Sequence, residues 1–134
     1  MQQFKIVVDF SNQKSIDMKP FIPSKIAEII FAIAIAYFGY LHFKSVNMMA
    51  GGVPTFFPGD GKIWIYLSGA GFILAAIAIV VEIQKTLACY LLAAVLLIFV
   101  FAIHIKNFGT NPSGVLKDTA MAMAAIIIGN RRSK

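Results

Sequence analysis

Two histidines, a lysine and an aspartate are the residues of this sequence whose types best suit chemistry. His42 and His104 carry imidazole rings, which titrate near neutral pH and take part in proton transfer and ligand binding, and Lys117 and Asp118 are adjacent further along the chain. Each residue lies at the end of a long apolar stretch. An ionisable group there either faces other helices, as a candidate for ligand binding or proton relay, or simply reaches the lipid headgroups. The sequence leaves both interpretations open.

Metal binding is not expected at these residues. Two histidines and one carboxylate would suit zinc or iron by composition, but the sequence has no close ligand spacing such as HxxxH. Cys89 is the only cysteine, so it forms neither an internal disulfide nor a CxxC pair, and its apolar surroundings are typical of a buried structural residue. No catalytic residue is identifiable, and whether the protein is an enzyme stays open.

Four apolar stretches must position these side chains. Hydrophobic residues make up 59% of the chain and charged residues 13%, against about 25% in soluble domains. The stretches cover residues 25–43, 63–82, 87–105 and 115–130, and the first three have the length of about 20 residues that crosses a bilayer. The fourth is shorter, but the basic segment after it favours a span. The sequence predicts an all-α integral membrane protein, an antiparallel four-helix transmembrane bundle over residues 25–130.

The segments between and beyond these stretches have distinct characters. Residues 1–24 are expected to form a cytoplasmic tail, and residues 131–134 a basic C-terminal tail. Four residues, 83–86, separate the second and third stretches, and only "QKT" of these is polar, which requires a hairpin of helices. The loop of residues 44–61 contains apolar side chains that a solvated loop would not need, so we expect it to cap the outer end of the bundle.

The distribution of basic residues predicts the orientation. With four spans, eight basic residues fall on the side of the termini and four on the other side. The eight are Lys5, Lys14, Lys19, Lys25, Lys85, Arg131, Arg132 and Lys134, and the four are Lys44, Lys62, Lys106 and Lys117. The positive-inside rule then places both termini in the cytoplasm. His42, His104, Lys117 and Asp118 consequently meet at the outer end, together with Asp60 of the loop.

The remaining charged and small residues have plainer interpretations. The net charge of +6 comes from basic residues that flank apolar stretches, which favours anionic lipid headgroups over nucleic acid as their partner. Glu28 and Glu82 at the inner end are expected to be structural, with cytoplasmic proton entry as the alternative. Small residues spaced by four predict close helix packing, namely Gly71 and Ala75, Ala120 and Ala124, and Ala125 and Gly129.

Four short motifs occur in an order that resembles the DoxX-like family of small four-helix membrane proteins. They are "GYLHF" at the end of the first stretch, "VPTFFPG" in the outer loop, "YLSGAGFILA" in the second stretch and "LKDTAMA" opening the fourth. The chain departs from that family's pattern at Phe72, where members often carry a glutamate, and at Met123 and Ala124, where a glycine pair is common. The resemblance implies the cytoplasmic (inner) membrane of a bacterium or archaeon, and a link to thiosulfate:quinone oxidoreductase.

These observations lead to two functional expectations. The first is a small accessory or scaffold subunit of an inner-membrane complex, with other membrane proteins or further copies of itself as partners. The alternative, which the resemblance implies, is a membrane subunit of a quinone-linked oxidoreductase; quinone is the one cofactor considered, and no cofactor motif is evident. A small transporter would need a polar site near the bilayer midplane, and the helix centres are almost free of polar side chains.

Overall fold

The computed structural model describes residues 19–131, and these residues form helices and turns without any strand. The helices are α2 (Ser24–Lys44), the short α3 (Val46–Ala50), α4 (Gly61–Val81), α5 (Lys85–Phe99) and α6 (Ser113–Asn130). Beyond Phe99 the chain continues as one turn of π-helix, η2 (Val100–His104), and one of 3₁₀-helix, η3 (Ile105–Asn107). α2, α4 and α6 begin and end within about two residues of the apolar stretches, and α5 does so together with its continuation through η2 and η3, so the helical structure is as predicted.

Local signals explain where these helices begin and end. Pro23 precedes α2, and the carboxylate of Asp60 accepts a hydrogen bond from the backbone N–H of Lys62 (3.2 Å) at the start of α4. The turn between α4 and α5 is tight because Glu82 and Gln84 both adopt left-handed backbone conformations, with φ of 61° and 52°. These two left-handed residues reverse the chain direction within a few residues, so that α5 starts beside the end of α4.

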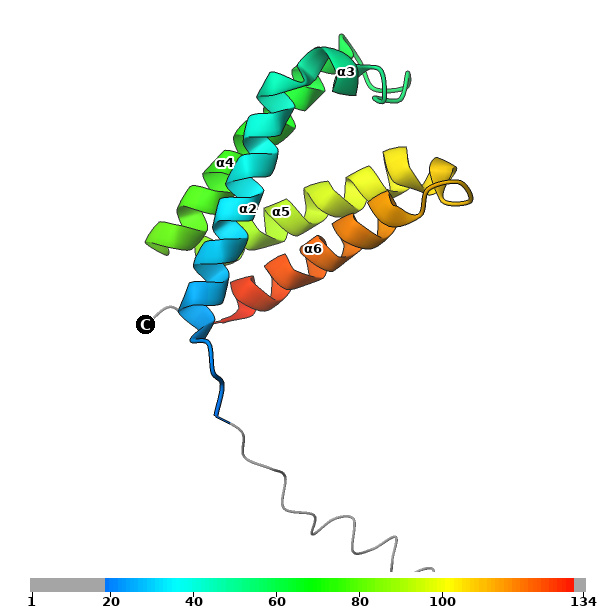
Figure 1. The fold of residues 1–134 in the computed structure, drawn as a ribbon. Helices are drawn as coiled ribbons and strands as arrows, with labels where there is room; N and C mark the ends of the chain where they lie inside the picture. The colour runs from blue at the N-terminus through cyan, green and yellow to red at the C-terminus, as the bar shows by residue number, and fades with distance from the viewer. Residues whose placement is uncertain (1–18, 132–134) are drawn as a thin grey trace, which may run out of the picture.

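The four long helices form two antiparallel pairs (Figure 1). α2 packs along α4, and α5 packs along α6; the pairs meet at one end and diverge toward the other. We call the meeting point the closed end (residues 24–28, 82–86 and 129–131) and the opposite side the open end (residues 42–62 and 104–114). The α3 segment and the following loop lie at the open end of the α2–α4 pair.

Small side chains allow the helices of each pair to approach closely. A Cβ atom on Gly39 of α2 would lie 2.7 Å from the carbonyl oxygen of Gly69 on α4, and a Cβ atom on Gly129 would lie 2.8 Å from the Cβ atom of Cys89. Neither position has room for a larger residue. Buried alanines and aliphatic residues such as Ile35 and Ile79 fill the space between the helices.

Large apolar side chains also cover the outside of the helices. Leu74, Phe101 and Ile127 each expose more than 60% of their surface, and similar residues occur on every long helix. Three helical segments are long and apolar enough to cross a membrane, namely α2, α4 and the continuous segment Lys85–Asn107, within the part of the chain that is described. The 18-residue helix α6 is less apolar and is not one of them. The predicted N-terminal tail lies almost wholly outside the described residues, as does the C-terminal tail beyond Arg131.

Candidate functional site

Three of the four predicted site residues meet at the open end of the α5–α6 pair. Nε2 of His104 lies 3.0 Å from one carboxylate oxygen of Asp118, and Nζ of Lys117 lies 3.6 Å from the other. Asp118 is buried, whereas His104 is about one-third exposed and Lys117 about half exposed. The expected contact between His104 and the fourth long helix is therefore present, and the buried carboxylate is its centre.

The position of His104 depends on two local features that the sequence pattern does not reveal. His104 is the last residue of the π-helical turn η2, whose extra residue per turn shifts the side chain away from its α-helical direction. Gly114 on α6 then leaves room for the ring, because a Cβ atom there would lie 2.6 Å from Nδ1 of His104. A π-turn and an opposing glycine together bring the imidazole to Asp118.

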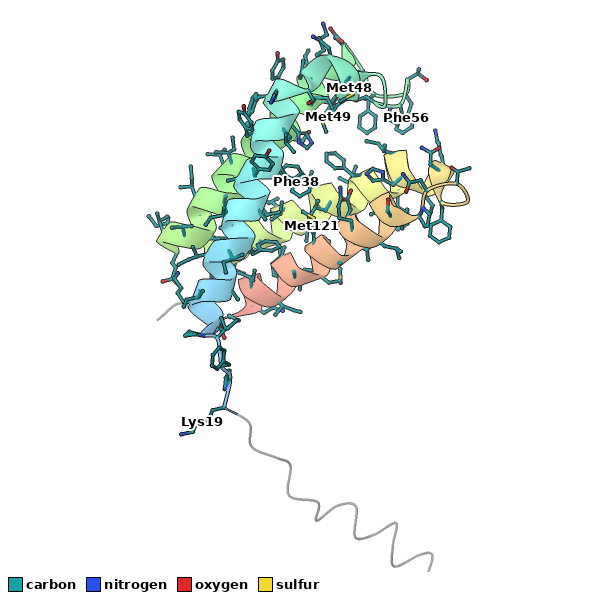
Figure 2. All side chains as sticks on the ribbon, viewed as in Figure 1. Lys19, Phe38, Met48, Met49, Phe56 and Met121 are labelled. Carbon is teal, nitrogen blue, oxygen red and sulfur yellow. The ribbon has the colours of Figure 1, made fainter. Side chains whose placement is uncertain are left out.

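Phe38 of α2 connects this group to the other helix pair. Nζ of Lys117 lies 4.9 Å from the centroid of the Phe38 ring, a distance typical of a cation–π contact. In Figure 2, Phe38 on α2 and Met121 on α6 lie in the region between the two pairs, and both pack against the core. Phe38 therefore closes part of the space between the diverging pairs.

His42 occupies a separate, aromatic environment on α2. Its Nδ1 atom lies 2.7 Å from the carbonyl oxygen of Phe38, and only 5% of the residue is exposed. The ring edge contacts Phe72 of α4 at a centroid distance of 5.0 Å, and Phe99 of α5 stacks beside it at 6.3 Å. Among the described contacts, none joins His42 directly to Asp118. The predicted cluster thus consists of two parts, one around Asp118 and one around His42, with Phe38 between them.

An apolar groove runs between α4 and α5 and is bordered by Phe72 and Phe99, the two phenylalanines that contact His42. Its volume is about 540 Å³, and it extends from Gln84 at the closed end to the loop residues at the open end. Gly71 and Ala75 are among the small residues along it, while leucines and isoleucines of both helices form its sides. The hydroxyl of Ser68, the side-chain hydroxyl in its lining, donates to the carbonyl oxygen of Trp64 and so adds little polarity.

The loop of residues 44–61 forms the open-end wall of this groove. Phe57 contacts the Trp64 ring at a centroid distance of 5.1 Å, and Nε1 of Trp64 donates to the carbonyl oxygen of Pro58 at 2.9 Å. Phe57 and Trp64 both line the groove. Phe56 stacks on Phe57, remains 70% exposed and marks the outer edge of the loop in Figure 2. Asp60, expected near the histidines, instead caps α4.

The closed end carries an ionic network that ties both pairs together. Glu28 of α2 accepts from Arg131 at 2.9 Å and pairs with Lys85 of α5 at 3.4 Å, and Glu28 and Lys85 are both buried. Lys25 pairs with Glu82 at 2.9 Å, and this hydrogen bond holds the pKa of the Glu82 carboxyl below its ordinary value. Every acid here has at least one basic partner, so the network has the character of a structural clamp.

Sequence reasoning missed the aromatic residues around His42 and the groove itself. Phe38 lies four residues before His42, which is the only local signal for their hydrogen bond. Phe72 and Phe99 come from other helices, so their contact with His42 depends on how the pairs diverge. Among the described residues, no group of three histidine, cysteine or acidic side chains is arranged to hold a metal ion.

Comparison with known proteins gives a family without an assigned activity. No curated protein and no solved structure matches the chain. Residues 31–129 match the family described as a domain of unknown function, DUF8561. This stretch begins at the eighth residue of α2 and ends one residue before the end of α6, so it contains most of both helix pairs, the groove and every residue around His42 and Asp118. The chain therefore belongs to the DUF8561 family.

Proposed function

We propose that the protein is a small four-helix subunit of the cytoplasmic membrane that holds a lipid-soluble molecule in the α4–α5 groove as an accessory part of a membrane complex. The observation that carries this proposal is the groove itself. Its volume of about 540 Å³ lies within the range of about 300–1,000 Å³ of small-molecule sites. Its lining is apolar along almost its whole length, so an apolar ligand fits it and a strongly charged one does not.

The exposed apolar surface supports the membrane part of the proposal. A helix that is apolar on all sides is suited either to a buried core or to a bilayer. α2, α4 and α5 each present large aliphatic side chains outward. Exposing this apolar surface to water would cost about 25 cal/mol of free energy per Å². In this proposal α6 is the fourth span; it is short, and its start carries Lys117 and Asp118 near the outer headgroups.

The groove can be tested by filling it at Gly71. A Cβ atom on Gly71 would meet no other atom within 4 Å, so Gly71→Leu places its side chain in the groove without disturbing the helix pair. Gly109, in the connection between η3 and α6, has the same open surroundings away from the groove and supplies the matched control Gly109→Leu. We expect organic extracts of the purified wild-type protein and the Gly109 variant to contain an apolar compound enriched over bulk lipid. The Gly71 variant should lack it; equal extracts from all three proteins would contradict the proposal.

One observation favours a second candidate, a membrane subunit of a quinone-linked oxidoreductase. Phe72 and Phe99 border the groove and also flank His42, so an aromatic head group in the groove would find stacking partners beside an imidazole. The ultraviolet spectrum of the extract decides this point. A quinone band that disappears on chemical reduction supports the second candidate, and an extract without such a band rejects it.

A further inference from the structure

We infer that the α4–α5 groove holds one extended hydrocarbon chain of about 18 carbons, with its polar head group bound to Gln84 at the closed end and its terminal methyl group at the loop beside Trp64. This inference rests on the proposed function of the groove, and it specifies the size, the head-group site and the direction of the ligand.

The volume of the groove corresponds to a single chain. A water molecule occupies about 30 Å³ of the liquid, and a methylene group has nearly the same size. The volume of about 540 Å³ therefore accommodates about 18 methylene groups. A lipid with two chains of this length has roughly twice as many. Only one of its chains would fit.

The length of the groove gives the same answer independently. Its lining on the α5 segment runs from Leu87 to Ile103, which covers about 24 Å at about 1.5 Å per residue. An extended alkyl chain advances about 1.25 Å per carbon, because its C–C bonds of about 1.5 Å alternate in direction at tetrahedral angles. A chain of about 19 carbons therefore spans the groove. Because volume and length agree, the groove is on average one chain wide.

Gln84 is the polar side chain of the lining that suits a head group. The described hydrogen bonds already use the protons of the other two, since Ser68 donates to the carbonyl oxygen of Trp64, and Nε1 of Trp64 donates to that of Pro58. Gln84 is exposed, and its amide offers two N–H donors at the closed-end limit of the groove. A head group with an acceptor oxygen, such as a carboxyl group, can bind there while its chain enters the groove.

The turn between α4 and α5 holds Gln84 in place. Its backbone is left-handed, with φ of 52°, and its carbonyl oxygen accepts from the N–H of Ala88 at 2.9 Å. The next residue, Lys85, is buried and pairs with Glu28 at 3.4 Å, so the chain is anchored directly beside Gln84. The amide is therefore presented from a fixed backbone position, which reduces the entropy lost on binding.

The open end of the groove suits a methyl group instead. Val53, Pro54 and Phe57 of the loop line this end together with the ring of Trp64, and Phe57 contacts that ring at a centroid distance of 5.1 Å. A terminal methyl group meets this apolar wall without cost. A polar head group would lose its water there without gaining a partner, which is unfavourable. The chain therefore runs from Gln84 toward the loop.

Trp64 measures this direction, because it is the only tryptophan of the chain and lines the open end of the groove. Bromine quenches tryptophan fluorescence at short range. Two saturated acids of about 18 carbons, brominated beside the carboxyl group or at the terminal carbon, are compared on the full-length protein in a sterol-based detergent, which has no linear chain to compete. The terminally brominated acid should quench most of the fluorescence with saturation. The other acid should displace it but quench little itself.

A shorter acid and two variants test the anchor at Gln84. A terminally brominated acid of half the length, held at Gln84, should end midway along the groove and quench little. Gln84→Met keeps the length of the side chain but removes its donors, so the long acid should require about tenfold higher concentration. Tyr90→Phe removes a hydroxyl at the same end, where Tyr90 bonds Asn130 outside the groove, and should leave the curves unchanged.

The outcomes separate this inference from the proposed function. Stronger quenching by the acid brominated beside its carboxyl group, or equal quenching by the short and the long acid, would overturn the inference while the groove remains a ligand site. An unchanged curve for Gln84→Met would do the same. If no acid quenches with saturation but the wild-type extract still contains an enriched apolar compound, only the inference fails. If that compound is missing too, the proposed function fails with it.

Discussion

Asp118 is the residue on which the open end of the α5–α6 pair depends. Its buried carboxylate accepts from His104 and lies near Lys117, so it joins the π-helical turn after α5 to the start of α6. Removing a buried acceptor leaves its donors unpaired, which costs more than the hydrogen bond itself contributes.

Replacing this carboxylate should therefore destabilise the protein. We expect Asp118→Ala to lower the free energy of unfolding in detergent by about 1–3 kcal/mol, measured by thermal unfolding. Lys117→Met should cost less than about 1 kcal/mol, because that amine is half exposed and its contact with Asp118 is longer. Similar effects of both changes would show that the carboxylate is not the centre of the group.

At the closed end, two glutamates of the same network should respond differently to substitution. Glu28 is buried with Lys85, so Glu28→Gln leaves the buried ammonium with only its longer contact to Glu82, at 3.8 Å, and should cost about 3–5 kcal/mol. Glu82 is more exposed, and Glu82→Gln should have a clearly smaller effect. Urea titration of both variants at neutral pH measures the difference, and a larger effect at Glu82 would contradict the assignment.

The contribution of Glu82 should also depend on pH in a defined direction. The hydrogen bond from Lys25 lowers the folded-state pKa of Glu82 below its ordinary value of 4.5, so the folded protein keeps this carboxylate charged when the unfolded chain begins to bind protons. Its stabilisation is present above that ordinary pKa and is lost as the pH falls through the folded-state value. The Tm difference between wild type and Glu82→Gln should therefore be constant near neutral pH and shrink in acid. Lys25→Met should weaken the pH dependence of that difference, because Lys85 remains near Glu82 as the second cation that lowers its pKa.

The contacts of a single residue were predictable from the sequence only where its partners lie nearby along the chain. His104 and Asp118 are joined by a short connection, and their contact follows from it. His42 was expected in one cluster with them, but its environment is set by Phe72 and Phe99, which belong to two other helices. No pattern in the sequence states how far two helix pairs diverge.

At the scale of elements, the sequence predicted where the helices lie in the chain but not which of their residues contact one another. Four apolar stretches predicted the four long helices, because length and composition determine helices directly, although only the first three stretches have spanning length. The spacing of small residues identified Ala125 and Gly129, which are buried, but also Gly71, which has no close neighbour, and Ala120, which is exposed. Gly39 of α2 and Gly69 of α4 let their helices approach closely, but neither glycine has a small residue four positions away on its own helix. The π-helical turn η2, which directs the His104 side chain toward Asp118, likewise has no sequence signature.

The crossing of α2 and α4 allows a matched test of this packing. Gly39→Ala would place a Cβ atom 2.7 Å from the backbone oxygen of Gly69, so the helices must separate, at a cost of about 1–3 kcal/mol. Gly71→Ala on α4 meets open space and should be neutral or slightly stabilising, because alanine is the better helix former. Thermal unfolding of the two variants in the same detergent compares them, and equal stability would place the crossing elsewhere.

For the whole molecule, placement in a membrane and orientation there are both predictions. The distribution of basic residues predicts that both chain ends lie in the cytoplasm and the open end of the helix pairs outside. Cys89 is buried, so it should not compete for a thiol reagent with a second cysteine introduced at residue 134. An impermeant thiol reagent should label it only after the cells are opened, whereas a cysteine in place of Thr55 in the loop should react in intact cells. The opposite pattern would invert the topology.

The ionic clamp has a consequence for how the chain is assembled during translation. Glu28 precedes Lys85 by 57 residues and Arg131 by 103 residues. When Glu28 is added to the growing chain, both cations that will neutralise its carboxylate are still unsynthesised. In the proposed membrane, α2 must therefore enter the bilayer with this acid uncompensated, or wait at the interface until α5 arrives. Its contact with Arg131 can form only after α6 has been made, so the first of the described helices is among the last to be fixed in place.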